Sequence, residues 1–213
     1  MKKGSDGMLV SVSVLGVYNR LIPAVMNVNN TSANFLHVDV MDGIFVDNKK
    51  FPYEVVKDVK LISKKKLDIH LMVNDYSLIY QYALLKPEYL TFHVEIINDY
   101  TLIDYVKSQG IKVGLAINPD TKIEKILPYI DDVDMILFMS VDPGQAGQSF
   151  DYNVLDKISR VKEVAPAGLV ISVDGGINVK TKELCEKAGC NMVVSGSFIT
   201  NSLNYEEKIE LLK

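Results

Sequence analysis

Two histidines and two aspartates stand near the ends of three apolar runs, and these residue types suit a divalent metal ion. His37 and Asp39 lie two residues apart in one run, while His70 and Asp174 each stand at the end of another. The runs predict strands, in which residues two apart point to the same face. Because an unpaired buried charge is very costly, we expect these side chains to meet around one cation. Zinc, iron(II), manganese and cobalt all accept such a donor set.

Glycine turns after the last two apolar runs indicate a phosphate site. Gly175 and Gly176 follow one run, and Gly196 and Ser197 follow the next. Backbone N–H groups at such turns can approach an anion closely because glycine has no Cβ, and the Ser197 hydroxyl can add a donor. The alternative is that the glycines serve turn geometry alone. Two such turns in succession favour phosphate binding.

The segment 140–150 is long for a connection between a strand and a helix, and it contains Gly144 and Gly147. Long glycine-containing loops in compact domains are often lids or binding loops. A solvated excursion is the alternative. Because the segment follows a predicted strand, it should lie at the same end of the molecule as the metal and phosphate groups, and this position favours a lid.

A cation and a phosphate held on one face would fit a short, extended sugar phosphate. A metal that binds a ketone oxygen and a neighbouring hydroxyl stabilises the enediolate formed when the carbon between them loses its proton. Asp39 and Asp174 come from different predicted strands, so one could take that proton and the other could return one on the opposite face. The predicted reaction inverts a stereocentre next to a ketone and needs no organic cofactor.

The elements that must position these groups are short apolar runs alternating with amphipathic stretches. Such strands separated by helices indicate a parallel sheet covered on both faces. Eight units predict an α/β fold, a single (β/α)8 (TIM) barrel domain over residues 1–213, with active groups at the carboxyl ends of the strands. A doubly wound open sheet is the alternative. The predicted strands are 8–14, 35–40, 66–72, 89–93, 112–117, 135–139, 169–173 and 192–195. The predicted helices include 53–61, 76–85, 102–108, 123–129, 153–164, 180–188 and 205–212.

Composition limits the partners of the chain. It has 213 residues, 48% hydrophobic and 23% charged, which is ordinary for a globular protein. A formal net charge of -4 argues against nucleic-acid binding, which usually shows a basic patch. No apolar run approaches the roughly 20 residues that span a bilayer, and the polar start 1–7 has no signal-peptide pattern. We therefore expect a cytoplasmic protein with neither nucleic-acid nor membrane partners.

Several of these segments resemble, in the same order, the signatures of the ribulose-phosphate 3-epimerase family over nearly the whole chain. The matching motifs are residues 37–46, 68–73, 173–178 and the lid segment 139–150. The resemblance implies a homo-oligomeric (dimeric or hexameric) enzyme of the pentose phosphate pathway that converts D-ribulose 5-phosphate to D-xylulose 5-phosphate. It also implies metal ligation by His37, Asp39, His70 and Asp174, with Asp39 and Asp174 as the acid/base pair.

The same resemblance implies further contacts with the substrate. Phosphate contacts are expected from Gly175, Gly176, Gly196 and Ser197. Other substrate contacts are expected from Ser13 and His70, from the thioethers of Met41, Met72 and Met139 around the reacting carbons, and from the closing lid residues Gly144, Gln145, Ala146 and Gly147. His93 also matches the family. A histidine in an apolar strand is usually a hydrogen-bonded core residue, so we predict a structural role for it.

The chain departs from the family pattern near the substrate. Asp47 replaces a usual proline, Gln145 a common aromatic residue and Ala146 a common glycine. These changes leave the metal and proton chemistry intact and bear on substrate length and lid closure. A related branch acts on D-allulose 6-phosphate, and the lid pattern leans toward that branch. The glycine turns at 175–176 and 195–197 lean back toward the pentulose enzymes.

Two other functions on the same barrel are weighed against the epimerase. A decarboxylase or aldolase of this kind would be expected to carry an Asp-x-Lys-x-x-Asp run after a strand, and residues 37–42 contain no lysine. A catalytically inactive barrel that only binds sugar phosphates would be expected to lack a ligand or one aspartate. Both aspartates and both histidines are present, so the epimerase is favoured.

Overall fold

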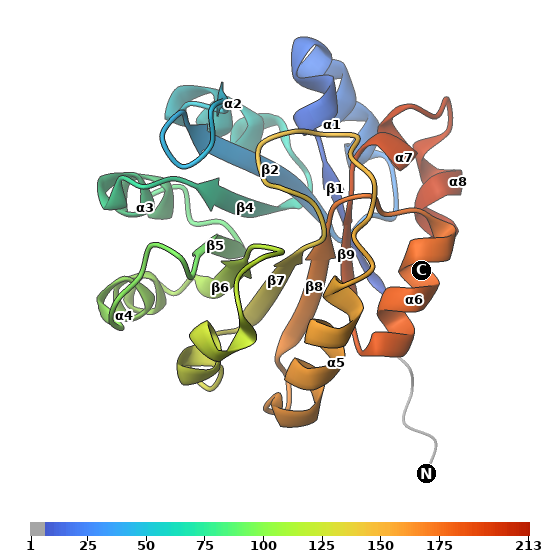
Figure 1. Cartoon of the computed structure of the whole chain (residues 1–213). Coiled ribbons are helices and arrows are strands. Elements are labelled where there is room, and N and C mark those ends of the chain that lie inside the picture. The colour runs from blue at the N-terminus through green and yellow to red at the C-terminus, as the bar shows by residue number, and fades with distance from the viewer. Residues whose placement is uncertain (1–6) are drawn as a thin grey trace.

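A closed barrel of eight parallel strands forms the centre of the computed structural model, which describes residues 7–213 (Figure 1). β1 pairs with both β2 and β9, and this double pairing closes the sheet. The predicted (β/α)8 barrel is therefore confirmed, and the open-sheet alternative is wrong. In order around the barrel the strands are β1 (Leu9–Ser13), β2 (Phe35–Asp42), β4 (Lys66–Met72), β5 (Tyr89–His93), β6 (Lys112–Ile117), β7 (Met135–Met139), β8 (Val170–Asp174) and β9 (Met192–Ser195).

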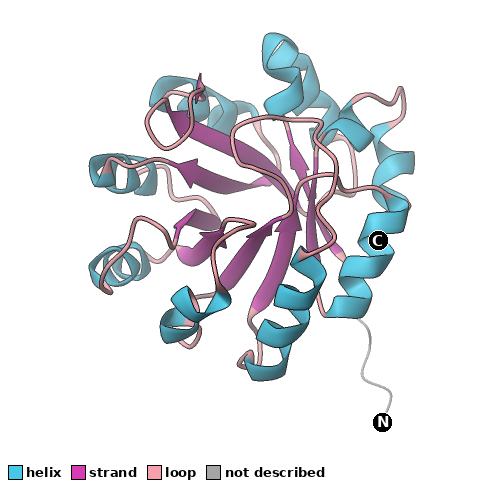
Figure 2. Ribbon diagram, viewed as in Figure 1, coloured by secondary structure: helices cyan, strands magenta, loops and turns pink. Residues whose placement is uncertain are grey.

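Helices cover the outside of the barrel (Figure 2). Their inward faces repeat at helical spacing; α5, for example, buries Val154, Ile158 and Val161. The α-helices are α1 (Leu21–Asn29), α2 (Tyr53–Ile62), α3 (Tyr76–Ala83), α4 (Thr101–Ser108), α5 (Val154–Val164), α6 (Val179–Ala188), α7 (Ser197–Thr200) and α8 (Tyr205–Glu210). The 3₁₀ helices are η1 (Leu15–Arg20), η2 (Ile123–Lys125) and η3 (Leu127–Tyr129).

Several local features differ from the sequence predictions. The predicted helix 123–129 is wrong, because this stretch forms the short η2 and η3 instead. Pro128 lacks a backbone N–H and cannot continue an α-helix. Helix α1 was not predicted; it carries Pro23 in its first turn, a position where proline is tolerated. The two-residue strand β3 (Lys49–Lys50) adds antiparallel to the end of β2 and was also not predicted.

The interior of the barrel changes from apolar to polar along its axis. The layer at the amino end consists of Phe35, Tyr89, Met135 and Met192, contributed by alternate strands as is usual in such barrels. Toward the carboxyl end many of the inward-facing side chains are polar, beside an apolar cluster of Ala116, Leu137, Met139 and Val194. The buried or half-buried polar residues here include Ser11, Ser13, His37, Asp39, Asp68, His70 and Asp174. The fold therefore places the predicted metal ligands at the end where barrel active sites lie.

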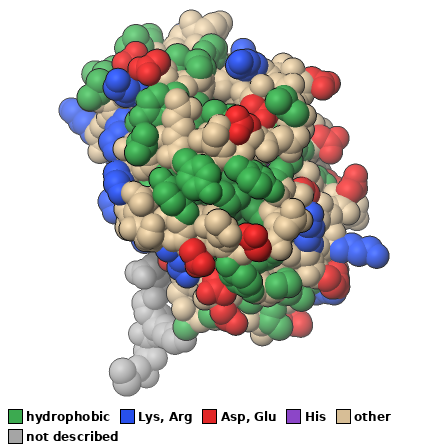
Figure 3. All heavy atoms as spheres, turned by 90° about the vertical axis from the view of Figure 1, so that its left-hand side faces the viewer, with side chains coloured by type: hydrophobic (Ala, Val, Ile, Leu, Met, Phe, Trp, Pro, Cys, Tyr) green, Lys and Arg blue, Asp and Glu red, His purple; other side chains and the backbone are tan. Residues whose placement is uncertain are grey.

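The outer surface shows apolar side chains gathered along the side of the barrel formed by α3 and α4 (Figure 3). Tyr80 packs edge-to-face on Tyr105 there, with ring centroids 4.5 Å apart. The chain has three histidines, all fully buried, and none is visible on this face. Within residues 7–213, every helix is too short or too polar to cross a membrane. Residues 1–6, part of the polar start for which no signal peptide is expected, lie outside the described residues.

Candidate active site

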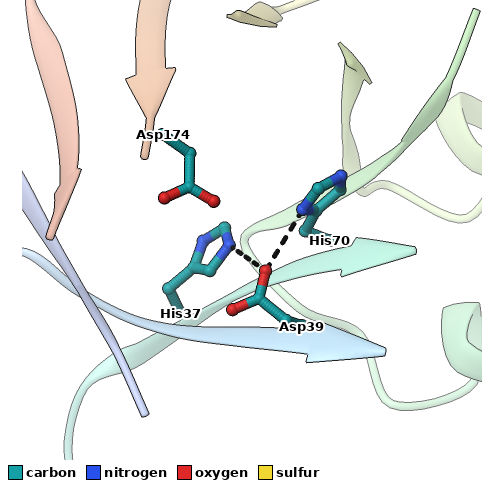
Figure 4. A group of neighbouring side chains, drawn as sticks. All are labelled: His37, Asp39, His70 and Asp174. Atoms are coloured by element: carbon teal, nitrogen blue, oxygen red, sulfur yellow. Dashed lines mark hydrogen bonds and ion pairs between the residues drawn. The ribbon is translucent and has the colours of Figure 1, made fainter. Parts of the chain in front are cut away.

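The predicted metal ligands lie together at the carboxyl end of the barrel (Figure 4). His37 and Asp39 come from β2, His70 from β4 and Asp174 from β8, and one possible ligand atom of each lies within 4.8 Å of the others. Strand register explains part of this meeting, because Asp39 is the partner of His70 in the parallel β2–β4 ladder. Strands β1 and β9 separate β2 from β8, so Asp174 approaches from across the barrel mouth.

Asp68, which was not predicted as a site residue, holds His37 from one side. Its Oδ2 lies 2.7 Å from His37 Nδ1 and accepts from Ser11 Oγ at 2.8 Å. Burial alone would lower the pKa of His37, but the charges of Asp39 and Asp68 outweigh it and raise this pKa well above its usual value. The sequence held a signal for this residue: Asp68 stands two positions before His70 and shares its face of β4.

Asp39 is bonded through both carboxylate oxygens. Its Oδ2 accepts from Ser13 Oγ at 2.8 Å. Its Oδ1 lies 3.1 Å from His37 Nε2 and 3.2 Å from His70 Nδ1. Burial alone would raise the pKa of Asp39, but the two histidines outweigh it and hold this pKa well below its usual range. Asp39 is therefore ionised at neutral pH, and Ser13 fixes its orientation.

Asp174 has the opposite electrostatic character. Burial and the negative charge of Asp39 raise the pKa of Asp174 to about 7. One carboxyl group of the site is thus ionised while the other can hold a proton near neutral pH. Paired titratable groups whose environments separate their pKa values are typical of acid/base assignments in active sites.

His93 extends the cluster behind His70. The Nε2 atoms of the two rings lie 2.9 Å apart, and His93 Nδ1 lies 3.1 Å from Glu95 Oε2. Burial lowers the pKa of His93 to about 4, so the ring is neutral at pH 7. His93 is a buried, hydrogen-bonded core residue, and its structural role stays a prediction. Its contact with a predicted metal ligand was not anticipated.

The cluster is suited to hold a divalent cation. In each histidine, one ring nitrogen is engaged by a neighbouring side chain and the other faces the centre of the cluster. His37 meets Asp68 through Nδ1, which leaves Nε2 toward the cluster, and His70 meets His93 through Nε2, which leaves Nδ1. Two imidazole nitrogens and two carboxylates suit zinc, iron(II), manganese or cobalt. Among residues 7–213, no other group of histidine, cysteine and acidic side chains has comparable geometry.

A pocket opens above the cluster; its space, open solvent included, is about 540 Å³. It brings together most of the residues predicted to contact a substrate. The predicted residues that line it are Ser13, Asp39, Met72, Met139, Gly144, Gln145, Ala146, Gly147, Asp174, Gly175, Gly176, Gly196 and Ser197.

Three predicted site residues do not line this pocket. His37 and His70 are fully buried behind it, as suits residues that would hold a cation rather than touch a substrate. Met41 shares the inward face of β2 with Asp39 and is 2% exposed. The predicted substrate contacts of Met41 and His70 therefore remain predictions.

Backbone conformation and packing require glycine in the turn after β8 but not at Gly196 in the turn after β9. Gly175 and Gly176 have positive φ values of 110° and 57°, and a Cβ on Gly176 would lie 2.6 Å from the backbone nitrogen of Phe150. Backbone conformation and packing both demand glycine at these positions. At Gly196, the atoms nearest to an added Cβ belong to Ser13, at an ordinary 3.5 Å. Local packing does not require glycine at position 196, and its small size leaves space in the pocket.

The β7–α5 connection crosses over the carboxyl ends of the strands (Figure 1). Asn48, from the loop after β2, donates through Nδ2 to the carbonyl oxygen of Gly144 at 2.8 Å. Within the connection, Gln148 Nε2 donates to the carbonyl oxygens of Asp142 and Gln145 at 2.7 and 3.0 Å. These bonds hold the segment over the pocket, where a lid would have to lie.

The fold and the site together are those of a barrel enzyme that works at the carboxyl ends of its strands. A family model described as the Ribulose-phosphate 3 epimerase family matches residues 9–200, and the chain belongs to this family. The chain is 37% identical over 214 residues to ribulose-phosphate 3-epimerase of Helicobacter pylori (strain ATCC 700392 / 26695), covering 97% of each protein. It is 34% identical over 195 residues to that of Bacillus subtilis (strain 168), covering 89% of this chain and 90% of the relative.

Solved structures with the same fold include enzymes of other kinds. One is 3-hexulose-6-phosphate synthase from Salmonella typhimurium, with a TM-score of 0.71, 15% identity and 96% coverage of each chain. Another is orotidine 5'-phosphate decarboxylase from Pyrococcus horikoshii OT3, with a TM-score of 0.69, 13% identity, and coverage of 96% of this chain and 97% of that one. At these identities the likeness concerns the fold alone. Family membership makes the chain an isomerase, a ketose-phosphate 3-epimerase, and sets the decarboxylase and binding-protein alternatives aside.

Proposed function

We propose that the protein interconverts D-ribulose 5-phosphate and D-xylulose 5-phosphate by two-base proton transfer at C3. The observation that carries this proposal is the pair Asp39 and Asp174, which both line the pocket but come from strands β2 and β8 on different sides of its mouth. A carboxylate on each side of a planar carbon can remove a proton from one face and deliver one to the other.

The two carboxylates would take opposite roles in each direction of the reaction. Asp39, held ionised by the two histidines, would remove the C3 proton in one direction. Asp174 would deliver a proton to the opposite face through a carboxylate oxygen that does not bind the cation; its pKa of about 7, raised by burial and by Asp39, is that of the metal-free protein. After one turnover the protonation states are exchanged, and the reverse reaction restores them.

A divalent cation held by His37, Asp39, His70 and Asp174 would supply electrophilic stabilisation of negative charge on the substrate oxygens next to C3. The two imidazoles are fixed by their second nitrogens, and the two carboxylates belong to the acid/base pair. The buried position of the cluster favours this assignment, because carboxylates and imidazoles this deep in a barrel need charge compensation.

The phosphate of the substrate would bind at the turns after β8 and β9. Gly175, Gly176, Gly196 and Ser197 all line the pocket, and their backbone N–H groups together with the Ser197 hydroxyl are suitable donors to an anion. Asp39 and Asp174 line the same pocket, so a phosphate held at these turns would orient the sugar toward the carboxylates. Ser13, Met72 and Met139 would line the space for the carbon chain.

Comparing substrates and following the proton together test this function. The metal-reconstituted protein should have a higher kcat/KM for D-ribulose 5-phosphate than for D-allulose 6-phosphate; the reverse order would assign it to the hexulose-phosphate branch. Product formed in deuterium oxide should carry deuterium at C3. Retention of the original proton at C3 would exclude the two-base scheme. A homo-oligomer (dimer or hexamer) acting in the pentose phosphate pathway is the accompanying proposal.

A further inference from the structure

Glu95 stands at the end of a hydrogen-bonded chain that reaches His70 from behind the metal cluster. His70 Nε2 lies 2.9 Å from His93 Nε2, and His93 Nδ1 lies 3.1 Å from Glu95 Oε2. Both imidazoles are fully buried, and the ring of Phe45 covers His93 at a centroid distance of 4.4 Å. The proposed proton transfers do not use this chain of groups.

The donors and acceptors along the chain allow one consistent arrangement with a cation at His70. Ligation through His70 Nδ1 requires a lone pair there, so the hydrogen of this neutral ring must lie on Nε2. Only one hydrogen fits between the two Nε2 atoms, so His93 must accept at Nε2 and carry its own hydrogen on Nδ1. That hydrogen is donated to Glu95, whose other oxygen, Oε1, accepts from the backbone N–H of Asn118 at 2.9 Å.

We propose that Glu95 and His93 are positioning residues that select the form of His70 with a free lone pair on Nδ1. The inference rests on the proposed function, because it requires a cation at the cluster. A carboxylate that accepts from Asn118 and from His93 can only receive hydrogen bonds. The direction of every donor between Glu95 and His70 is therefore fixed from the Glu95 end.

The isosteric substitution Glu95→Gln separates this role from simple packing. The backbone N–H of Asn118 can only donate, so it should hold the carbonyl oxygen of the new carboxamide. The amide NH₂ would then face His93 Nδ1 and force that atom to accept. His93 would donate through Nε2, and His70 would carry its hydrogen on Nδ1, where a cation must bind. The variant keeps the size of the side chain but reverses the chain of donors.

Glu88→Gln is a matched control next to the opposite end of the same strand, β5. Glu88 precedes β5 as Glu95 follows it, and their side chains are 20% and 18% exposed. Glu88 pairs with Lys66 and Lys112 at 2.8 Å each, remote from the histidines. Loss of one negative charge at either end of β5 should change the free energy of unfolding by a similar amount. Only Glu95→Gln should also change the affinity of the cluster for zinc.

The experiment uses Zn²⁺ as the probe and two readouts other than activity. Because the chain has three histidines, long-range ¹⁵N spectra of histidine-labelled protein should resolve each ring. In the zinc-loaded wild-type protein we expect His93 protonated on Nδ1 and His70 protonated on Nε2. Zinc affinity, measured by competition with a chromophoric chelator, should fall about 10- to 100-fold in Glu95→Gln and stay at the wild-type value in Glu88→Gln. The His37 signals, with their separate partner Asp68, report whether the fold is intact.

Each failure has its own signature. If zinc-loaded wild-type protein shows His93 protonated on Nε2, or if Glu95→Gln binds zinc as tightly as Glu88→Gln, the positioning role is overturned while the proposed function stands. If the wild-type protein does not bind zinc through His37 and His70, the proposed metal site itself fails and the positioning role fails with it. Should Glu95→Gln not fold, the wild-type spectrum alone decides.

Discussion

Asp68 Oδ2 lies 2.7 Å from His37 Nδ1, and both side chains are fully buried in the barrel. The contact turns the other ring nitrogen, Nε2, toward the cluster that includes Asp39. Carboxylates that hold metal-binding histidines from behind commonly fix the orientation and basicity of the ring. Asp68 is therefore expected to act on a bound cation through His37, without binding the cation itself.

Substituting Asp68→Asn should weaken metal binding and lower stability. The carboxamide oxygen can replace Oδ2 as acceptor for Ser11 and His37. Its NH₂ group would then occupy the place of Asp68 Oδ1, which has no hydrogen-bond partner among the described residues. A buried amide without a partner costs about 1–3 kcal/mol, and loss of the carboxylate should reduce zinc affinity about 10- to 100-fold. Thermal unfolding and chelator competition measure the two effects; unchanged values for both would refute the role of Asp68.

Removing either member of the carboxylate pair should abolish turnover while preserving the fold. Asp39→Asn and Asp174→Asn each delete one proton-transfer group, and such groups contribute about 10²–10⁴-fold to rate. Reduced kcat with native circular dichroism is the expected result. Asp58→Asn, on the exposed face of α2, is the control and should turn over normally. A near-normal kcat in either site variant would contradict the two-base scheme.

Enlarging Gly196 should impair binding of the phosphorylated substrate specifically. A Cβ at this position meets nothing closer than 3.5 Å, so Gly196→Val should fold, but its side chain would enter the pocket. We expect KM to rise by at least about tenfold, equivalent to about 1.4 kcal/mol of lost binding, with little change in melting temperature. Gly7→Ala, where a Cβ has its nearest neighbour 3.9 Å away, is the control. An unchanged KM in Gly196→Val would remove the phosphate assignment.

The stability that the folded protein gains from a bound metal should increase as the pH rises through neutrality. In the metal-free protein, burial and Asp39 raise the pKa of Asp174 to about 7, and Asp39 and Asp68 outweigh burial to raise that of His37. A raised pKa means that the folded chain holds the proton more tightly than the unfolded chain does. The stability from these protons is therefore present at low pH and lost as pH rises through each folded-state pKa, for Asp174 between about 4 and about 7.

A cation takes the place of these protons, so its binding releases them. The Tm difference between zinc-loaded and metal-free protein should accordingly increase from about pH 5.5 to about pH 8. Scanning calorimetry at matched zinc concentrations measures it. A difference that stays constant over this range would show that neither Asp174 nor His37 changes protonation when the metal binds.

Much of the site was predictable because strand periodicity is simple. Two-residue spacing places His37 and Asp39 on one face, and a barrel requires strand ends to meet at one mouth. The convergence with His70 and Asp174 follows from these two facts. The same periodicity could have identified Asp68, which shares the face of His70, but a carboxylate deep in a strand has no signature until its partner is known.

Other features depend on distances between strands that the sequence does not encode locally. The contact between His70 and His93 needs β4 and β5 in their observed register, in which His70 is the partner of Thr91. Helix α1 is not evident from the sequence because Pro23, Asn27 and Asn29 are poor helix formers. Apolar spacing favours a helix over 123–129, but Pro128 breaks an α-helix there.

The aromatic and thioether layer of Phe35, Tyr89, Met135 and Met192 blocks the amino end of the barrel. Reactant and product must then enter and leave through the same opening, the mouth of the pocket beneath the segment 140–150. The product therefore has to leave the pocket before another reactant can bind, so each compound should inhibit turnover of the other competitively. If the proton transfers are fast, release of the product through this opening, rather than bond breaking, would limit kcat.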